Sequence, residues 1–320
     1  MTDTPAVEAS FVVIAYNEAP TLERTLRSIT GQEALSDYEI VVVDDASTDG
    51  TPAIVEGYAR TDPAVRLVRL ESNSGRGAAR KIGVEASHGE LIAMVDSDIV
   101  LPPHWYRTCR EQLGDDDAVG GIAVPDGDVA YLYRRFSLEP RPVLHSAALT
   151  GNNALYRRSV FDVVQFEPEL RNGEDIALGH AMERAGLRTR TIEDLLVRHE
   201  ESKTFRKSVA WLFESGAGAS RQLRRYRRVR QPDIAFAGFL ATVLGSVLLG
   251  RRGRPLAAAA LPTAYLAMMS AAHVHTRFVP QRGRLGAFAG AVAADSAQLL
   301  SYFGGRVVGH ALSRDGVAPE

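Results

Sequence analysis

Leu91-Ile-Ala-Met-Val-Asp-Ser-Asp-Ile-Val-Leu101 is an apolar stretch interrupted only by two aspartates and a serine. Its leading apolar run predicts a strand that is buried on both faces of a parallel sheet. The run ends at Asp96 and Asp98, and ionised carboxylates are costly to bury without a partner or a metal. Two hard oxygen ligands placed this close together suit Mg²⁺ or Mn²⁺ carrying a substrate diphosphate. The alternative for an isolated Asp-x-Asp is a solvated turn after an ordinary strand.

Length and composition limit the class of protein. With 320 residues, 45% of them hydrophobic and 24% charged, the chain can form one large α/β core with residues to spare. Its net charge of −2 argues against a general nucleic-acid-binding protein. The single cysteine, Cys109, excludes an internal disulfide and fits a reducing compartment. Residues 1–10 lack a charged and then apolar signal region, so we expect no secretory leader and a chain that begins in the cytosol.

Strand and helix signals alternate from the start of the chain to the 91–101 stretch and beyond it. Besides that stretch, apolar runs predict strands at 11–15, 38–43, 64–70 and 119–124. Helical spacing and stop signals predict helices between them: one with Leu22, Leu26 and Ile29 on one face, one at 51–60, one with Ala79, Ile82 and Ala86 on one face, and one ending near Leu113. Such alternation indicates right-handed βαβ crossovers and a parallel sheet. Ligands bind beyond the carboxyl ends of strands in these sheets, and the polar breaks after the strands fall there.

The middle of the sequence is less regular. Residues 126–149 have no clean period and are expected to form a loop or short helices over the site. A short strand is predicted at 151–156, followed by a helix that opens at Arg157 and Arg158. Another helix follows Asn172-Gly-Glu-Asp175, and the last strands are expected to be an edge strand at 188–192 and a short strand at 197–199.

The composition shifts after residue 199. An apolar stripe at 205–213 lies beside basic residues and predicts an amphipathic helix in a membrane interface. Six arginines then crowd residues 221–230, directly before the first of three apolar segments at 234–250, 256–274 and 285–308. This order fits the positive-inside rule and attraction to an anionic membrane surface.

The three apolar segments are not equally suited to crossing a bilayer. The first is short, Pro262 would kink the second, and the third contains Asp295, Gln298 and Arg306. Arginines between the first two segments fit poorly with an outside loop, so a shallow hairpin is one possibility, and a soluble helical cap is the alternative to any membrane region. We therefore expect an α/β domain at 1–202, interfacial helices at 203–232 and a hydrophobic membrane region of two or three helices at 233–320.

Five motifs in order resemble the family 2 glycosyltransferases. They are Ala15-Tyr-Asn-Glu18, Val43-Asp-Asp-Ala-Ser-Thr-Asp-Gly50, Asn73-Ser-Gly-Arg-Gly-Ala-Ala-Arg80, Asp96-Ser-Asp98 and Gly173-Glu-Asp175. The resemblance covers residues 11–199 and implies an inverting enzyme with the GT-A nucleotide-diphospho-sugar transferase fold, a mostly parallel sheet flanked by helices. The C-terminal region is more loosely similar to membrane-attached members that act on polyprenyl-phosphate-linked or other membrane acceptors.

The resemblance implies a nucleotide-sugar site. Asp45 corresponds to the residue that accepts a hydrogen bond from the nucleotide base, a task a carboxylate can perform; the alternative is a helix cap, for which Asp49 is the better candidate. Glu18 corresponds to a residue near the ribose, and the backbone at Ala15, where the family often has proline, approaches the base. Arg80 resembles the cation that faces the diphosphate. Lys81 stands where the family often has asparagine, so which of these two cations faces the diphosphate is open.

The metal and catalytic roles come from the later motifs. Asp98 resembles the direct ligand of a divalent metal, Mn²⁺ or Mg²⁺, and Asp96 lies nearer the ribose or holds a metal-bound water. Asp175 matches the general base that removes the acceptor proton, and its neighbour Glu174 could instead hold the acceptor. A helix cap is the alternative role for Asp175. The resemblance further places Asn152 and Asn153 beside donor sugar and acceptor, and His199 near the diphosphate, unless His199 is a surface histidine.

We therefore expect a metal-dependent glycosyltransferase at the cell membrane with its catalytic domain on the cytoplasmic side. It would use a nucleotide-diphosphate sugar donor and a membrane-associated lipid or glycan acceptor. One alternative is a sugar-1-phosphate nucleotidyltransferase, but such enzymes have a glycine-rich basic loop where this chain has Tyr16-Asn-Glu18. A catalytically inactive nucleotide-sugar-binding protein is the other. The sequence leaves the base, the sugar and the acceptor open.

Overall fold

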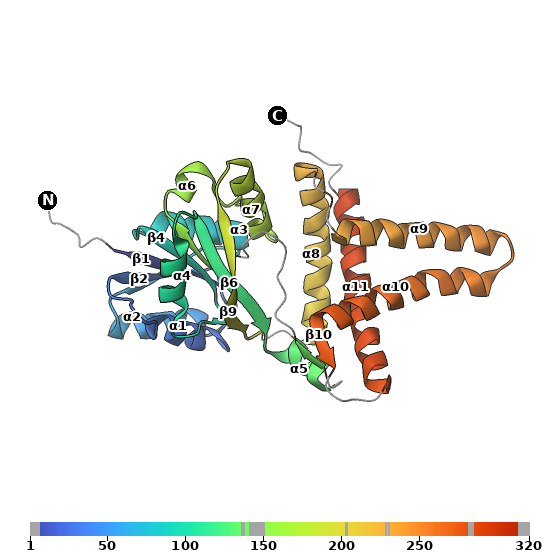
Figure 1. The fold of residues 1–320 in the computed structure, drawn as a ribbon, viewed down its shortest axis with the longest axis horizontal. Helices are drawn as coiled ribbons and strands as arrows, with labels where there is room; N and C mark the ends of the chain where they lie inside the picture. Colours follow the sequence, from blue (N-terminus) through green and yellow to red (C-terminus); the bar gives the residue numbers. More distant parts are fainter. Residues whose placement is uncertain are drawn as a thin grey trace. The chain divides into compact units, whose positions relative to one another are not determined.

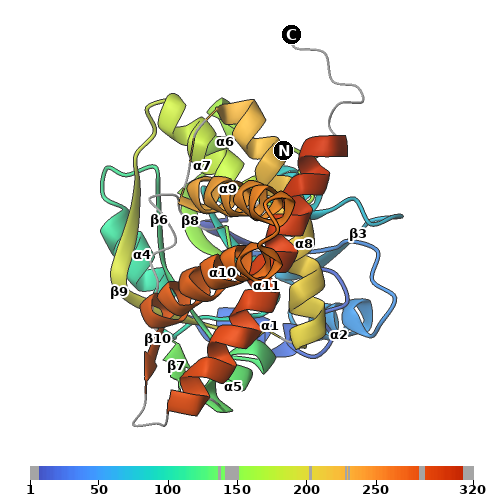
Figure 2. The same ribbon diagram turned by 90° about the vertical axis from the view of Figure 1, so that its right-hand side faces the viewer.

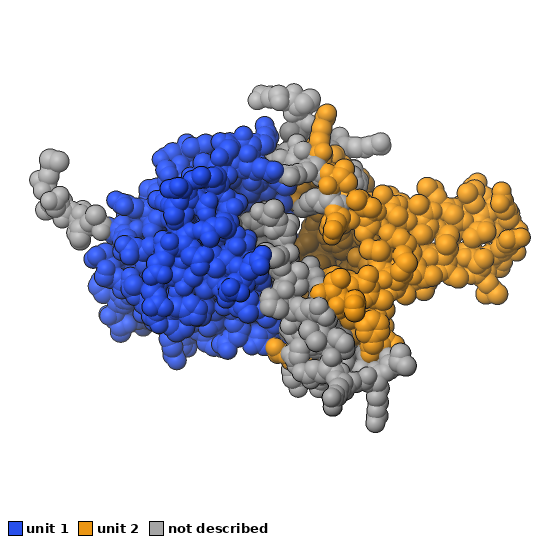
Figure 3. Space-filling view, viewed as in Figure 1, with its two compact units in different colours: residues 1–127, 142–202 blue, residues 128–141, 203–320 orange. Residues whose placement is uncertain are grey.

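The computed structural model of the chain describes residues 7–135, 138–140, 151–201, 204–227, 229, 231–280 and 285–312. The chain forms two compact units, with residues 1–127 and 142–202 in unit 1 and residues 128–141 and 203–320 in unit 2 (Figure 3). The segment 128–141 is thus grouped with the C-terminal helices although it comes from the middle of the sequence.

Unit 1 is built on an eight-stranded mixed sheet with the strand order β3-β2-β1-β4-β8-β6-β9-β5 (Figure 1). Its strands, in chain order, are β1 Ala9–Ala15, β2 Tyr38–Asp44, β3 Val65–Arg69, β4 Leu91–Asp96, β5 Ile99–Val100, β6 Ala118–Pro125, β8 Asn153–Arg157 and β9 Thr189–His199. Strands β1 to β4 pair in parallel, whereas β8 runs antiparallel to both of its neighbours. The carboxyl ends of β1, β2 and β4 therefore lie next to one another at the same end of the strands, as predicted.

Helices cover both faces of this sheet because alternate side chains of each central strand point to opposite sides. They are α1 Leu22–Thr30, α2 Thr51–Thr61, α3 Arg76–Ala86, α4 Trp105–Leu113, α6 Val160–Val163 and α7 Glu174–Arg184. Phe11 and Val13 of β1 pack in the cluster that holds α1 and α4 side chains, whereas Val12 packs in the cluster that holds those of α7. The predicted strand and helix positions up to residue 124 are confirmed within a few residues.

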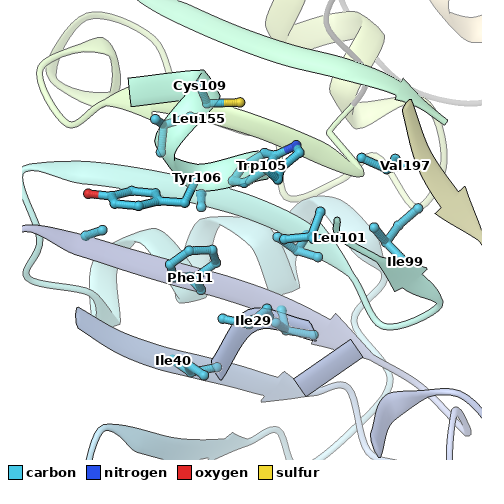
Figure 4. Packing of buried hydrophobic residues seen from close by; sticks show 14 of the residues in the cluster. Phe11, Ile29, Ile40, Ile99, Leu101, Trp105, Tyr106, Cys109, Leu155 and Val197 are labelled. Carbon is cyan, nitrogen blue, oxygen red and sulfur yellow. The ribbon is translucent and has the colours of Figure 1, made fainter. Parts of the chain in front are cut away.

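The larger cluster centres on aromatic side chains (Figure 4). The ring of Phe11 lies 6.4 Å from that of Trp105 and 5.9 Å from that of Tyr106, centroid to centroid. All three rings are fully buried, as is Cys109 one turn further along α4. This packing fixes α4 against the central strand β1.

One expectation for the last strands was wrong: the segments 188–192 and 197–199 are parts of one continuous strand, β9. Strand β5 pairs only with Arg198 and His199 at the end of β9, so within the described residues 189–191 pair with β6 alone, as expected of an edge strand. The pairing with β6 shifts register between Gly120 and Ile122, so β9 accommodates extra residues in a bulge. Gly121 permits this bulge, because a Cβ at that position would lie 2.3 Å from the carbonyl oxygen of Leu195.

Unit 2 consists mainly of four long helices, α8 Phe205–Tyr226, α9 Gln231–Arg251, α10 Pro255–Arg277 and α11 Leu285–Leu312. The segment that was expected to be irregular contributes α5 Asp128–Arg135 and the strand β7 Leu138–Pro140, which pairs with β10 Phe278–Pro280. Residues 141–150 of that segment lie outside the described residues. The stripe predicted at 205–213 is the first part of α8, and α10 continues through Pro262.

Helices α8 and α11 pack along each other, and α9 and α10 form an antiparallel hairpin (Figure 1). Glycines bring α8 and α11 into backbone contact: a Cβ on Gly216 would lie 2.0 Å from the carbonyl oxygen of Tyr302, and one on Gly305 would lie 1.8 Å from that of Phe213. Among the described helices, α9 and α10 are the two that are long and apolar enough to cross a membrane.

The burial of Cys109 generates a prediction. Burial raises the pKa of its thiol well above the ordinary value, and the side chain has no exposed surface, so both the thiolate and access to it are suppressed. We expect the native protein to resist a maleimide at neutral pH and to react once urea unfolds unit 1, as measured by mass spectrometry. Rapid labelling of the native chain would contradict the packing of α4.

Candidate active site

The candidate site lies at the carboxyl ends of the neighbouring strands β1, β2 and β4. In the sheet register, Ala15 is opposite Asp44 on one side, and Ile14 is opposite Asp96 on the other. The N–H of Asp45 donates to the carbonyl oxygen of Ala15 over 2.9 Å, so the acidic loop after β2 starts directly beside the end of β1. Parallel pairing therefore brings three of the sequence motifs together.

The Asp45 carboxylate holds the loop that precedes α3. Its two oxygens accept the N–H groups of Ser74, over 2.6 Å, and Gly75, over 2.9 Å. Gly75 has a φ of +89°, a conformation that favours glycine. Asp49, not Asp45, accepts the N–H of Thr51 at the start of α2. The buried Asp45 thus fixes the position of the Asn73–Arg80 motif.

Glu18 is half-buried in the loop after β1. Its N–H donates to the hydroxyl of Thr51, and its carboxylate accepts the hydroxyl of Thr21, over 2.9 and 3.0 Å. The preceding Asn17 is left-handed, with φ of 57°, and its side-chain oxygen accepts the N–H of Thr48 over 2.8 Å. The loops after β1 and β2 are therefore tied to each other.

A buried network of acids and arginines surrounds Asp96. Arg80, whose side chain is 1% exposed, donates to Asp96 over 2.6 Å, to Glu174 over 2.9 Å and to the carbonyl oxygen of Gly151 over 2.6 Å. Arg76 donates to the other oxygen of Asp96 over 2.9 Å, with 40% of its side chain exposed. Both oxygens of Asp96 are thus engaged by arginines.

The network shifts the pKa values of its members. Asp96 raises the pKa of Arg76 above its ordinary value. Burial lowers the pKa of Arg80, but Asp96 and Glu174 more than offset this effect, so that its pKa is also raised. Burial and then the negative charge of Asp175 raise the pKa of Glu174. Both arginines therefore stay charged at any physiological pH.

Asp175 lies in the first turn of α7, beside this network. One of its oxygens accepts the N–H of Ile176 over 2.8 Å, and the other accepts that of Gly151 over 3.4 Å. Gly151 connects it to Arg80, because a Cβ on Gly151 would lie 3.1 Å from the Arg80 Cζ and 3.2 Å from the Asp175 Cβ. Asp175 is half-buried, whereas Glu174 is 1% exposed, so Asp175 is the more accessible of the two carboxyls.

Asp98 and His199 form a separate pair. The antiparallel pairing of β5 with β9 places Ile99 opposite His199, and His199 Nε2 lies 3.1 Å from the Asp98 carboxylate. Glu201 is 4.0 Å from the same nitrogen. Among the described residues, no group of three or more His, Cys, Asp or Glu side chains is arranged to hold a metal ion.

The Asp98 and His199 pair nevertheless fits a substrate-linked divalent cation. A carboxylate oxygen and an imidazole nitrogen are both ligands for Mn²⁺, and a carboxylate with substrate phosphates is the usual set for Mg²⁺. Such a cation takes its remaining ligands from phosphate oxygens and water, so two protein ligands suffice.

The two asparagines differ in their surroundings. Asn153 is buried, and its side-chain oxygen accepts two hydrogen bonds. One comes from the backbone N–H of Gly121 over 2.8 Å, and the other comes from the indole N–H of Trp105 over 3.4 Å. Its amide donates to the Asn152 side chain over 2.9 Å. Asn153 therefore ties β8 to β6 and α4, and Asn152 is the more accessible residue.

Arg76 is the residue of this site to which the motifs assign no role. Of the two cations considered for the diphosphate, Arg80 is buried among protein acceptors, and Lys81 lies 3.8 Å from Glu85 on the same helix. Helical spacing is the signal that could have found Arg76, because residues 76 and 80 are one turn apart and share a face of α3.

Comparison with known proteins gives the fold and the family. The sequence model described as glycosyl transferase family 2 matches residues 10–165. The structure is similar to that of mannosyltransferase PcManGT from Pyrobaculum calidifontis in complex with GDP-Man and Mn²⁺, with a TM-score of 0.58 and 23% identity, over 95% of this chain and 88% of that one. At this identity the likeness shows the fold alone, and the predicted GT-A fold is confirmed.

Curated relatives match part of the chain. The succinoglycan biosynthesis protein ExoO of Rhizobium meliloti is 38% identical over an aligned length of 194 residues, and the alignment covers 53% of this chain and 54% of that protein. The dolichyl-phosphate β-glucosyltransferase ALG5C of Trichomonas vaginalis is 41% identical over an aligned length of 133 residues, with coverage of 39% of this chain and 40% of that protein. The chain spans about half the length of the first of these relatives. The mixed sheet, the motifs at the carboxyl ends of its strands and these matches together identify residues 10–165, the part that the family model matches, as a glycosyl transferase family 2 domain.

Proposed function

We propose that the chain transfers a sugar from a nucleotide-diphosphate sugar to a hydroxyl or phosphate group of a membrane-associated acceptor, with inversion at the anomeric carbon. The observation that carries this proposal is the network at the carboxyl edge of the sheet, where Asp96 and Glu174 share the buried Arg80 and Asp175 lies beside them. The match of residues 10–165 to glycosyl transferase family 2 supports glycosyl transfer as the chemistry of this network.

The donor nucleotide would lie along the ends of β1 and β2. A carboxylate has about four lone-pair sites, so Asp45 can accept a base N–H in addition to those of Ser74 and Gly75. Glu18 and the backbone at Ala15 would lie beside the ribose and the base. Asn152 would lie beside the donor sugar and the acceptor. Asn153 would position Asn152 through the hydrogen bond that its amide donates to the Asn152 side chain.

The diphosphate would lie between the end of β4 and His199. Asp98 and His199 would hold Mn²⁺ or Mg²⁺, which offsets the negative charge that grows on the leaving nucleoside diphosphate. Arg76 is the arginine of the network with an exposed side chain, so we assign it the contact with the diphosphate. Arg80 keeps Asp96 and Glu174 in place.

The transfer step needs a base for the acceptor. The acceptor oxygen attacks the anomeric carbon, the bond from that carbon to the diphosphate oxygen breaks, and the acceptor proton passes to Asp175. Glu174 is less suited to this task, because it is buried and its carboxylate is held by Arg80. Asp175 is half-buried and next to the network.

The nature of the acceptor and the location are the less constrained parts of the proposal. The two apolar helices α9 and α10 and the arginine-rich residues 221–230 before them support attachment to the cell membrane, with unit 1 on the cytoplasmic side. The relative from Trichomonas vaginalis is named for a dolichyl-phosphate acceptor, which supports a lipid-linked one here.

The competing function, an inactive nucleotide-sugar-binding protein, makes a different prediction for one assay. Incubation with UDP-, GDP- and dTDP-sugars, Mn²⁺ and a polyprenyl phosphate should release nucleoside diphosphate if the chain is a transferase. Binding of a donor without release of any nucleoside diphosphate across that set would favour the inactive protein.

Replacing the two arginines separates their roles. Arg80→Met leaves Asp96 and Glu174 buried without their shared cation, so we expect a loss of about 3–5 kcal/mol in the free energy of unfolding. Arg76→Met removes a half-exposed cation and should cost about 1 kcal/mol or less, but should weaken donor binding at least tenfold. Urea unfolding and titration with the nucleotide sugar measure the two effects. Normal donor affinity in Arg76→Met would exclude Arg76 from the diphosphate site.

The metal requirement is tested at Asp98. Asp98→Ala should abolish transfer and the Mn²⁺-dependent part of nucleotide binding, which calorimetry with and without Mn²⁺ measures directly. Asp194→Ala, an exposed aspartate on β9, is the matched control and should behave as wild type. Full activity of the wild type in excess EDTA would refute a metal-dependent reaction.

Asp175→Asn tests the base. Asparagine keeps the shape and is also a good helix cap, but it cannot take a proton. We expect transfer to slow on the order of 10²–10⁴-fold with donor affinity unchanged. The control is Asp162→Asn, an exposed acid in the first turn of α6. Normal turnover of Asp175→Asn would place the base elsewhere, with Glu174 the next candidate.

A further inference from the structure

The helices α9 and α10 are held together along their whole length. Near the base of the hairpin, the hydroxyl of Tyr265 donates to the carbonyl oxygen of Ala235 over 2.9 Å. Near its turn, the hydroxyl of Ser246 donates to the carbonyl oxygen of Ala258 over 2.5 Å. Gly238 makes room for the Tyr265 ring, because a Cβ there would lie 2.3 Å from its hydroxyl oxygen. The two helices therefore form one defined antiparallel unit.

Charges occur at the two ends of this hairpin and are absent between them. No Asp, Glu, Lys or Arg lies at 234–250 in α9 or at 255–276 in α10. Arg251, Arg252 and Arg254 form the turn, and Asp233 lies at the base. At 1.5 Å per residue, the uncharged part of α9 is about 25 Å long and the whole helix about 32 Å, close to the roughly 30 Å of a bilayer's hydrocarbon core.

The outer surface of the hairpin is apolar and uncovered within the described residues. Its most exposed side chains between base and turn include Leu244, Val247, Leu248 and Met268, which are 49–67% exposed. Few residues of either helix are buried inside the protein. An apolar surface of this kind on both helices marks a contact with lipid or with another apolar partner.

Helices α8 and α11 have a different character. Polar side chains of α11 are buried within the helical unit: the amide of Gln298 donates to the Ser208 hydroxyl of α8 over 3.1 Å, and Arg306 donates to Asp233 at the base of α9 over 2.5 Å. Both views show α8 and α11 running across the base of the hairpin instead of along it (Figures 1 and 2). Helix α11 is therefore not a third helix of the hairpin.

We propose that α9 and α10 cross a lipid bilayer completely as a two-helix hairpin, while α8 and α11 lie at the cytoplasmic surface. This proposal rests on the membrane location given under the proposed function and specifies its geometry. A shallow hairpin would leave the arginines of the turn inside the hydrocarbon, where charged side chains are strongly disfavoured. Complete crossing places them among the head groups of the far leaflet, because the uncharged length matches the bilayer.

The distribution of positive charge fixes the direction of insertion. The base side carries Lys203, Arg206, Lys207 and the six arginines of 221–230, whereas the turn carries three arginines. The side with the excess of Lys and Arg stays cytoplasmic. In the sequence, α8 lies between unit 1 and the base of the hairpin and contains no candidate membrane span, so unit 1 stays on the cytoplasmic side with the base.

Single cysteines can test this arrangement, because the wild-type chain contains only the buried Cys109. Three exposed positions are compared: Val229→Cys at the base, Leu244→Cys in the middle of α9 and Arg252→Cys at the turn. A membrane-impermeant maleimide is applied to sealed vesicles of both orientations and to detergent-solubilised protein. Wild-type protein reports the background labelling of Cys109.

We expect Val229→Cys to be labelled only from the cytoplasmic face, Arg252→Cys only from the opposite face, and Leu244→Cys from neither face until detergent is added. Labelling of Arg252→Cys from the same face as Val229→Cys would overturn complete crossing. If carbonate also extracts the protein, membrane insertion itself is refuted. Labelling does not depend on turnover, so a failed transfer assay and a failed crossing are distinguishable.

Discussion

The buried guanidinium of Arg80 is the interaction on which the rest of the site depends. Its three nitrogens donate to Asp96 at the end of β4, to the carbonyl oxygen of Gly151 before β8, and to Glu174 in the first turn of α7. Because Arg80 itself belongs to α3, one side chain connects four segments that are far apart in the sequence. Such a cation tolerates burial only when all of its partners are present, so the four segments are fixed together.

The approach of these segments requires glycine at specific positions. A Cβ on Gly77 would lie 2.1 Å from the carbonyl oxygen of Glu167, and a Cβ on Gly151 would meet the Arg80 guanidinium. Gly173 has a φ of +77°, which turns the chain into α7 so that Glu174 and Asp175 fall in its first turn. Close packing and backbone conformation thus require glycine in the Asn73–Arg80 and Gly173–Asp175 motifs.

Local sequence patterns predicted most of the fold because they depend on neighbours in the chain. The apolar run before Asp96 and the spacing of Leu22, Leu26 and Ile29 each reflect burial of one face, and the structure has a strand and a helix there. For the same reason the candidate residues were predicted to lie at the carboxyl ends of the strands, and the structure has Ala15, Asp45 and Asp96 there. Family resemblance supplied the roles of single residues, which spacing alone does not give.

Features that depend on distant partners were not predictable from the sequence. The continuity of β9 depends on a bulge opposite Gly121, and nothing within 188–199 indicates it. The motif assigns Arg80 to the diphosphate, but its donors are used by groups 16 to 94 residues away. Arg80 is buried between Asp96 and Glu174, and Arg76, one turn away on α3, is left with an exposed side chain. The sequence does not show which of the two arginines is buried, because this depends on the positions of Asp96 and Glu174 in the folded chain.

The balance of charge in this network and in the separate pair beside it gives an independent reason for a divalent cation. Asp96, Glu174 and Asp175 contribute three carboxyl groups and Asp98 of the pair with His199 contributes a fourth, whereas Arg76 and Arg80 contribute two positive charges. A donor diphosphate adds further negative charge to a region where Arg80 is already committed to protein acceptors. Arg76 can offset only part of it, since it is also the partner of Asp96. A cation at Asp98 and His199 would supply the missing charge, so we expect donor and metal each to raise the affinity of the other by the same factor.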